Sequence, residues 1–150
     1  MSLTITNLQK KIDQQPVLEA VTFSLDRGQV VGLVGPNGIG KTTIFRTITH
    51  QYIADGGTVK VDDHDLATEP AQREAIFYLD QQHLFFRKYS LVKIAANYAL
   101  LYTDFDQAAF LHLIEKFGLN GAARFQSLSK GYQALVMVAL ALASQAPYVF

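Results

Sequence analysis

The sequence has no cysteine among its 150 residues. It therefore has no disulfide framework and no thiolate metal site, as is typical of a reducing compartment. An excess of charge of one sign is also missing, because thirteen basic residues balance thirteen acidic ones and no basic block stands out. This balance gives no reason to expect nucleic acid as a partner. With 49% hydrophobic and 17% charged residues, the composition is that of one globular domain.

Long hydrophobic stretches are absent as well. The longest wholly apolar run, residues 134–143, is too short to span a bilayer, which takes about 20 residues. The N-terminus, residues 1–5, lacks the charged and apolar regions of a signal peptide. We therefore expect a soluble protein without direct membrane insertion, so that any role at a membrane comes through a partner.

The first half of the sequence is rich in predicted strands. Alternating or continuous apolar patterns predict them at residues 3–6, 21–25, 29–34, 58–61 and 75–79. Residues 29–34 are almost wholly apolar, which is typical of a strand buried on both faces of a sheet. Helical spacing follows over residues 41–50. From about residue 83 the pattern becomes helical, and three residues stand where helix N-caps are expected: Ser90, Asp106 and Ser129.

The clearest motif follows the apolar run at 29–34. Gly35, Gly40, Lys41 and Thr42 match G-x-x-x-x-G-K-[ST], between a predicted strand and a predicted helix. Glycines let successive N–H groups point at phosphate oxygens, and the helix adds its positive N-terminal end. Lys41 can reach the outer phosphates, and the Thr42 hydroxyl can bind Mg²⁺. The motif predicts an ATP-binding loop of these residues: Gly35, Pro36, Asn37, Gly38, Ile39, Gly40, Lys41, Thr42 and Thr43.

A second motif, Leu128-Ser129-Lys130-Gly131-Tyr132-Gln133, opens the last predicted helix. Ser129 and Gly131 can offer an anion a hydroxyl, a free backbone N–H and the helix dipole. On its own, however, a serine at this place is more often a simple helix N-cap.

Together the two motifs resemble the ABC ATPase family, whose signature usually reads Leu-Ser-Gly-Gly-Gln. The resemblance covers nearly the whole chain. It implies an α/β fold of the P-loop NTPase type, with a mainly parallel sheet, an antiparallel N-terminal β section and an inserted helical subdomain. We divide the chain accordingly into a nucleotide-binding core at 1–82, a helical insert at 83–127, and the signature helix with the start of the next strand at 128–150.

The resemblance also implies a function. We expect the ATP-binding subunit of a transporter, which couples MgATP binding and hydrolysis to transport by a membrane permease partner at the cytoplasmic side. Two such cassettes, identical or different, would meet head to tail. Each ATP would lie between Gly35–Thr43 of one cassette and Ser129–Gly131 of the other. Lys130, in the third signature position, resembles a subset of bacterial exporters.

Two further site residues come from the resemblance. Gln81 stands where the family has a glutamine that contacts Mg²⁺ or the attacking water, and we expect it to act in catalysis together with Lys41. Gln82 and a simple solvated amide are the alternatives at this place. Ile12 stands where the family stacks an aromatic residue on adenine. An aliphatic side chain can pack on the base without the π contribution of an aromatic ring.

Residues 147–150 resemble the first half of the strand that ends, in this family, with the magnesium-binding aspartate and the catalytic glutamate. We therefore interpret the sequence as a fragment that lacks the main catalytic carboxylates and is inactive alone. A natural minimal nucleotide binder is the alternative to a fragment. Two other functions compete with the transporter subunit: a soluble ABC ATPase of translation or DNA repair, and a non-hydrolysing nucleotide-binding module.

Overall fold

The computed structural model describes residues 2–80 and 86–150. The chain forms two compact units, one of Met1–Tyr78 with Phe150 and the other of Leu79–Val149. Strands dominate the first unit and helices the second, in agreement with the predicted α/β class. The four-stranded sheet of the first unit is antiparallel throughout, whereas a mainly parallel sheet was expected.

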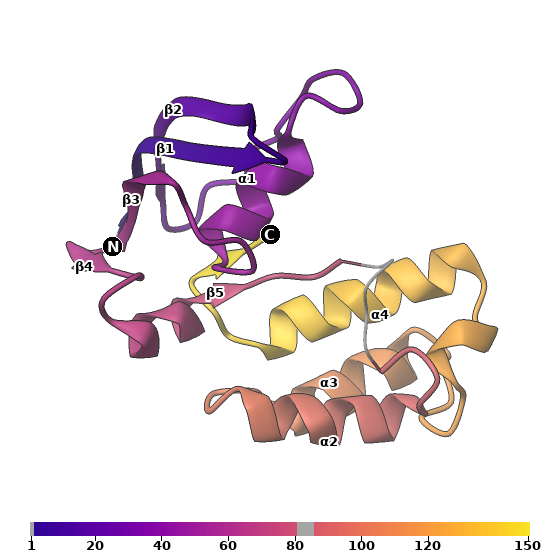
Figure 1. Ribbon diagram of the computed structural model, residues 1–150. Helices are drawn as coiled ribbons and strands as arrows, with labels where there is room; N and C mark the ends of the chain where they lie inside the picture. The colour runs from indigo at the N-terminus through magenta and orange to yellow at the C-terminus, as the bar shows by residue number, and fades with distance from the viewer. Residues whose placement is uncertain (1, 81–85) are drawn as a thin grey trace. The chain divides into compact units, whose positions relative to one another are not determined.

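An antiparallel sheet is the main element of the first unit. Its strands are β1 (Ser2–Ile12), β2 (Gln15–Asp26), β3 (Gly56–Val61) and β4 (His64–Asp65), in the order β2-β1-β3-β4 (Figure 1). Positive φ angles at Asp13 and Gln14 make the tight turn between β1 and β2. The alternation read at residues 3–6 is confirmed, because Leu3 and Ile5 are fully buried while Thr6 is exposed.

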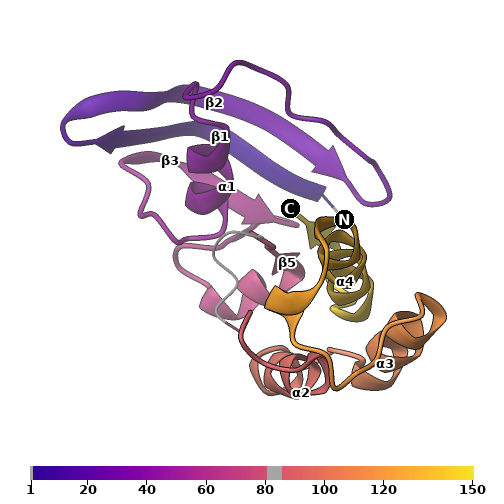
Figure 2. The same cartoon turned by 90° about the vertical axis from the view of Figure 1, so that its right-hand side faces the viewer.

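Helix α1 (Lys41–Ile48) packs against β1 and β2, as Figure 2 shows. Ile48 is fully buried, and the ring of Phe45 lies 5.5 Å from that of Phe150 between centroids. The 3₁₀-helix η1 (Pro70–Ala75) and the short strand β5 (Ile76–Phe77) follow the sheet along the chain. The packing of α1 fixes the direction in which its N-terminus points, and the phosphate-binding motif lies at that N-terminus.

The strand predicted at residues 29–34 is not formed. These residues have no regular secondary structure, and the side chains of Val30 and Val34 are 102% and 94% exposed. A strand that is buried on both faces needs a hydrogen-bonded neighbour along each edge and a packing layer over each face. In the described part of the chain no strand pairs with this segment, so its apolar character has nothing to pack against.

The second unit is built from helices α2 (Leu91–Leu101), α3 (Gln107–Lys116) and α4 (Lys130–Ala143), with the short 3₁₀-helix η2 (Phe125–Ser127) before α4 and strand β6 (Tyr148–Val149) after it. All three predicted N-caps are confirmed. The side chains of Ser90, Asp106 and Ser129 each accept a hydrogen bond from the backbone N–H three residues later. Among the described residues, no helix has the length and apolar character needed to cross a membrane.

Candidate phosphate-binding site

The loop that leads into α1 adopts a conformation that only glycine takes readily. Gly40 is the N-cap of α1, with a φ of 102° and no side chain to cap the helix. A Cβ atom added at Gly40 would lie 3.1 Å from Cγ1 of Val17 and 3.3 Å from its carbonyl oxygen. Gly38 also has a positive φ, of 82°. The loop therefore depends on glycine at position 40 for two separate reasons, conformation and space.

Unsatisfied backbone donors line the start of α1. The first backbone hydrogen bond of the helix runs from the N–H of Ile44 to the carbonyl of Gly40, at 2.9 Å. Within the described residues, the N–H groups from Gly38 to Thr43 donate no hydrogen bond. Free N–H groups at a helix N-terminus, together with the helix dipole, form a binding site for an anion.

The ammonium group of Lys41 lies over the loop that precedes it. Its Nζ donates hydrogen bonds to the carbonyl oxygens of Gly35, at 2.5 Å, and Pro36, at 2.7 Å. These two carbonyls hold the Lys41 ammonium group over the start of the loop. A phosphate that binds to the N–H groups would be close enough for Lys41 to leave the carbonyls and pair with it.

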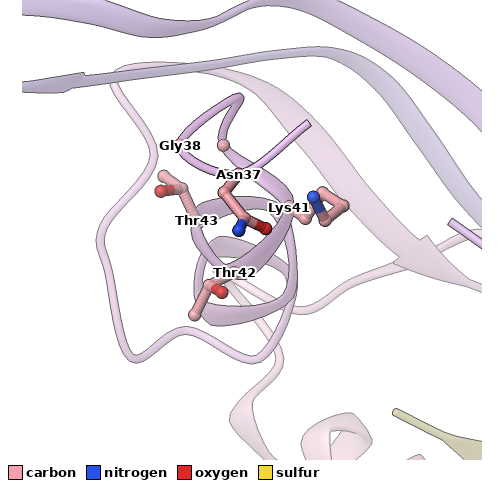
Figure 3. A pocket seen from close by; sticks show the side chains of 6 residues that line it. Asn37, Gly38, Lys41, Thr42 and Thr43 are labelled. Atoms are coloured by element: carbon pink, nitrogen blue, oxygen red, sulfur yellow. The ribbon is translucent and has the colours of Figure 1, made fainter. Parts of the chain in front are cut away.

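These residues enclose a shallow hollow of about 200 Å³, shown in Figure 3. Its lining consists of Asn37, Gly38, Gly40, Lys41, Thr42 and Thr43. The hydroxyl groups of Thr42 and Thr43 make no hydrogen bond within the described chain, so both can turn toward a ligand or a metal ion. The hollow offers N–H donors, one cation and two hydroxyls, and no carboxylate lines it among the described residues. This set of groups fits a chain of phosphates with a bound Mg²⁺ ion.

Val17 is a residue of this site that the sequence reasoning missed. It lies on β2, is half-buried, and supplies the atom nearest to a Cβ placed at Gly40, at 3.1 Å, with Cδ2 of Leu18 at 3.4 Å. Ile12, the residue expected beside the adenine base, lies at the end of β1 next to the hairpin turn and is 38% exposed. The contact of Val17 with the loop joins residues 23 positions apart (40 − 17), so no local pattern in the sequence could have indicated it.

Asp55 fixes the hairpin that carries Ile12. Its carboxylate accepts a hydrogen bond from the backbone N–H of Lys11, at 2.6 Å, and another from the Lys10 ammonium group, at 3.2 Å. The hydrogen bond from Lys11 and then the one from Lys10 lower the pKa of the Asp55 carboxyl below its usual value. The end of β1 is thus held to the segment before β3 by a carboxylate that stays ionised.

The signature motif lies in the second unit. Ser129 is the N-cap of α4, and its Oγ accepts a hydrogen bond from the N–H of Tyr132 at 3.3 Å. Ser129, Lys130 and Gly131 are all exposed, and a Cβ atom at Gly131 would meet nothing within 4 Å. The expected N-cap role of Ser129 is therefore confirmed, and its hydroxyl stays open to solvent.

Gln81, the expected ligand of magnesium or water, lies outside the described residues, as does Gln82. In the part of the chain that the structure covers, no three histidine or acidic side chains are grouped closely enough to hold a metal ion. Among the described residues, the Thr42 hydroxyl expected from the motif lines the hollow, as does the hydroxyl of Thr43.

Comparison with known proteins agrees with this geometry. The sequence profile of the ABC transporter family matches residues 18–150, and the chain belongs to this family. It is 28% identical over 143 residues to the ABC transporter ATP-binding protein YtrB of Bacillus subtilis, covering 95% of this chain and 49% of the relative. It is 32% identical over 159 residues to the lipopolysaccharide export system ATP-binding protein LptB of Escherichia coli, covering 99% of this chain and 65% of the relative.

Solved structures show the same fold. A putative ABC transporter (ATP-binding protein) from Pyrococcus furiosus superposes with a TM-score of 0.78 at 28% identity, over 95% of this chain and 70% of that structure. The ATP-binding subunit of another ABC transporter gives a TM-score of 0.84 at 26% identity, over 99% of this chain and 65% of that structure. The chain spans about half to two thirds of the length of the two curated relatives named above. The predicted α/β fold of the P-loop NTPase type is confirmed, as is the ABC ATPase family.

Proposed function

We propose that this chain binds MgATP through the loop Gly35–Thr43, as part of the ATP-binding subunit of a membrane transporter. The observation that carries the proposal is the row of free N–H groups from Gly38 to Thr43 beside the Lys41 ammonium group. The N–H groups would hold the phosphate oxygens. Lys41 would move from the carbonyls of Gly35 and Pro36 to the outer phosphates, where it offsets the charge that develops on the transferred phosphoryl group.

The Thr42 hydroxyl would hold Mg²⁺, and Gln81 would be a second ligand or the residue that orients water. The bound ion would supply charge neutralisation at the β- and γ-phosphates. Ile12 would pack on the adenine base from the end of β1.

The residues that would complete hydrolysis are expected from the part of the relatives' length that this chain does not span. The absence of a carboxylate from the described lining of the hollow supports this proposal. Loss of a positioned base or of a charge-stabilising group typically lowers a rate by about 10² to 10⁴-fold. The 150-residue chain alone should therefore bind nucleotide and turn it over at no more than the background rate.

The partners follow from the names of the relatives, which are ATP-binding components of transport and export systems. We infer a permease subunit in the membrane and a second cassette, and thus a place at the cytoplasmic side of that membrane. The exposed Ser129 hydroxyl and the exposed Gly131 would contact the γ-phosphate bound by the partner cassette. This arrangement would make ATP-dependent dimerisation depend on Ser129, and ATP binding by one cassette independent of it.

A non-hydrolysing nucleotide-binding module is the second candidate, since the described lining of the hollow contains no carboxylate. Phosphate release with MgATP would be measured for residues 1–150, for the full-length gene product, and for both with Lys41→Ala. We expect turnover that depends on Lys41 in the full-length protein and none in residues 1–150. If neither protein hydrolyses ATP, the result would favour the non-hydrolysing nucleotide-binding module. Lys41-dependent turnover by residues 1–150 would show that a catalytic carboxylate lies among the residues present.

A further inference from the structure

Gln133 is a buried polar residue of helix α4, and the residues after it in the helix, 134–143, are all apolar. Its side chain is 5% exposed, and it follows directly after the signature residues Ser129–Tyr132. The Nε2 amide group donates two hydrogen bonds, one to the carbonyl of Leu128 at 3.1 Å and one to the carbonyl of Phe125 at 3.3 Å. An amide NH₂ has two donor hydrogens, so these two bonds use its full donor capacity.

The two carbonyls that Gln133 binds flank the turn before Ser129. Phe125 begins η2 and is 1% exposed, while Leu128 is the residue that links η2 to Ser129. The backbone N–H of Gln133 also donates to the carbonyl of Ser129, at 2.8 Å. One residue therefore holds the segment 125–129 at three carbonyls, and these bonds fix the point where the chain enters α4.

The same segment is held from its other side by the residues that lead into α2. The N–H of Phe125 donates to Tyr89 at 3.2 Å, and that of Gln126 donates to Arg87 at 2.9 Å. In the opposite direction, the N–H of Leu91 donates to the carbonyl of Ala123 at 3.0 Å. The start of α2 and the start of α4 are thus joined by backbone hydrogen bonds through residues 121–126, and the amide of Gln133 completes this connection at α4.

We propose that Gln133 is a positioning residue, which holds Ser129 and Gly131 in the orientation that engages the nucleotide of a partner cassette. This inference rests on the proposed function, since it requires that the signature residues meet a phosphate. Without the amide, the carbonyl of Leu128 loses its donor among the described residues, and the carbonyl of Phe125 keeps only the backbone N–H of Leu128. The turn before Ser129 is then held less firmly and is free to shift. The loop Gly35–Thr43 belongs to the first unit, so ATP binding by a single cassette does not depend on Gln133.

The test uses the full-length protein with Gln133→Met, which keeps the length of the side chain and removes both donors. We expect monomer affinity for MgATP within about twofold of the parent, and an ATP-dependent dimer that is weaker by about tenfold, the scale of losing one or two hydrogen bonds. Ile114→Ala, a buried residue of α3 in the same unit, serves as the control for lost stability. It should lower the melting temperature and leave the dimer at the parent's affinity.

A second measurement separates this inference from the proposed function. Hydrogen exchange in the absence of nucleotide should be faster in Gln133→Met at the amides of residues 127–132, and unchanged at those of residues 38–43. Unchanged exchange at 127–132, or a dimer as tight as the parent's, would overturn the positioning role. An equal loss of dimerisation in Ile114→Ala would also overturn it, since stability alone would then explain the effect. A parent protein that neither dimerises with ATP nor hydrolyses it would contradict the proposed function, whatever the exchange data show.

If Gln133→Met does not fold, Gln133→Asn replaces it. Asparagine keeps the amide and shortens the side chain by one methylene, so its donors no longer reach both carbonyls. We expect the same pattern with a smaller change, and parent-like exchange and dimerisation in this variant would overturn the proposal.

Discussion

Helices α1 and α4 each begin after a loop, and they differ in whether the protein supplies acceptors for their N-terminal N–H groups. At α1 the N-cap is Gly40, which has no side chain, and the N–H groups from Gly38 to Thr43 donate no hydrogen bond in the described chain. At α4 the N-cap is Ser129, whose Oγ accepts from the N–H of Tyr132. The amide of Gln133 then holds the turn before the cap.

The difference indicates how each terminus meets an anion. The N–H groups at α1 have no protein acceptor, so a phosphate satisfies them without displacing one. At α4 the Ser129 hydroxyl already accepts from the N–H of Tyr132. The hydroxyl itself and the N–H groups of the exposed residues Lys130 and Gly131 remain open to solvent. We infer that the first terminus binds phosphate within one molecule and that the second contributes only when another molecule presents a phosphate to it.

Among these substitutions, Lys41→Ala should have the largest effect on ATP binding, because it removes the only cation in the described lining of the hollow. A hydrogen bond to a charged group contributes about 1.5–3 kcal/mol, so we expect ATP affinity to fall by roughly 10- to 150-fold. Calorimetry on the full-length protein would measure it. Lys116→Ala, an exposed lysine in the last turn of α3, is the control and should bind ATP as the parent does. An ATP affinity equal to the parent's in Lys41→Ala would contradict the assignment of the loop Gly35–Thr43 as the ATP-binding site.

Gly40→Ala should destabilise the loop by about 1–3 kcal/mol, because alanine at a φ of 102° is strained and its Cβ would crowd Val17. Gly38→Ala separates the two causes, since Gly38 also has a positive φ but a Cβ there would meet nothing within 4 Å. Chemical denaturation should show a larger loss for Gly40→Ala than for Gly38→Ala. Val17→Ala should recover part of the difference in a double-mutant cycle. Equal losses of stability in Gly40→Ala and Gly38→Ala would mean that crowding against Val17 does not contribute to the destabilisation.

Ser129→Ala should have the smallest effect on the isolated cassette, about 1 kcal/mol of stability, the usual scale for loss of an N-cap. Its effect on ATP-dependent dimerisation should be larger, while ATP binding by the monomer stays intact. Ser90→Ala is a matched control, because Ser90 caps α2 in the same unit through the N–H of Lys93. Sedimentation with ATP would compare the two variants in a hydrolysis-deficient form of the full-length protein. If Ser129→Ala and Ser90→Ala dimerise equally well, Ser129 acts only as the N-cap of α4.

Local patterns in the sequence predicted the parts of the molecule that depend on near neighbours. The caps at Ser90, Asp106 and Ser129 were predictable because each is a polar side chain before an apolar helix and bonds three residues ahead. The strand at 29–34 was predicted wrongly, since its apolar run requires partner strands, and none of the described strands pairs with it.

Long-range contacts of the candidate site could not be read from the sequence. The contact between Val17 and Gly40 joins a strand to a loop, and the bonds of Gln133 depend on the backbone path of η2. The motif at Gly35–Thr43 indicated which residues form the loop and what they bind. It did not indicate that Lys41 turns back onto the carbonyls of Gly35 and Pro36.

The most direct test of this account compares the two helix N-termini in one titration. Backbone amide resonances of the ¹⁵N-labelled full-length protein would be followed as magnesium pyrophosphate is added, since this ligand carries phosphates without base or ribose. We predict that the amides from Gly38 to Thr43 shift and saturate together, while those from Lys130 to Tyr132 stay in place. Saturating shifts at 130–132 with none at 38–43 would contradict the assignment of the phosphate site to the start of α1.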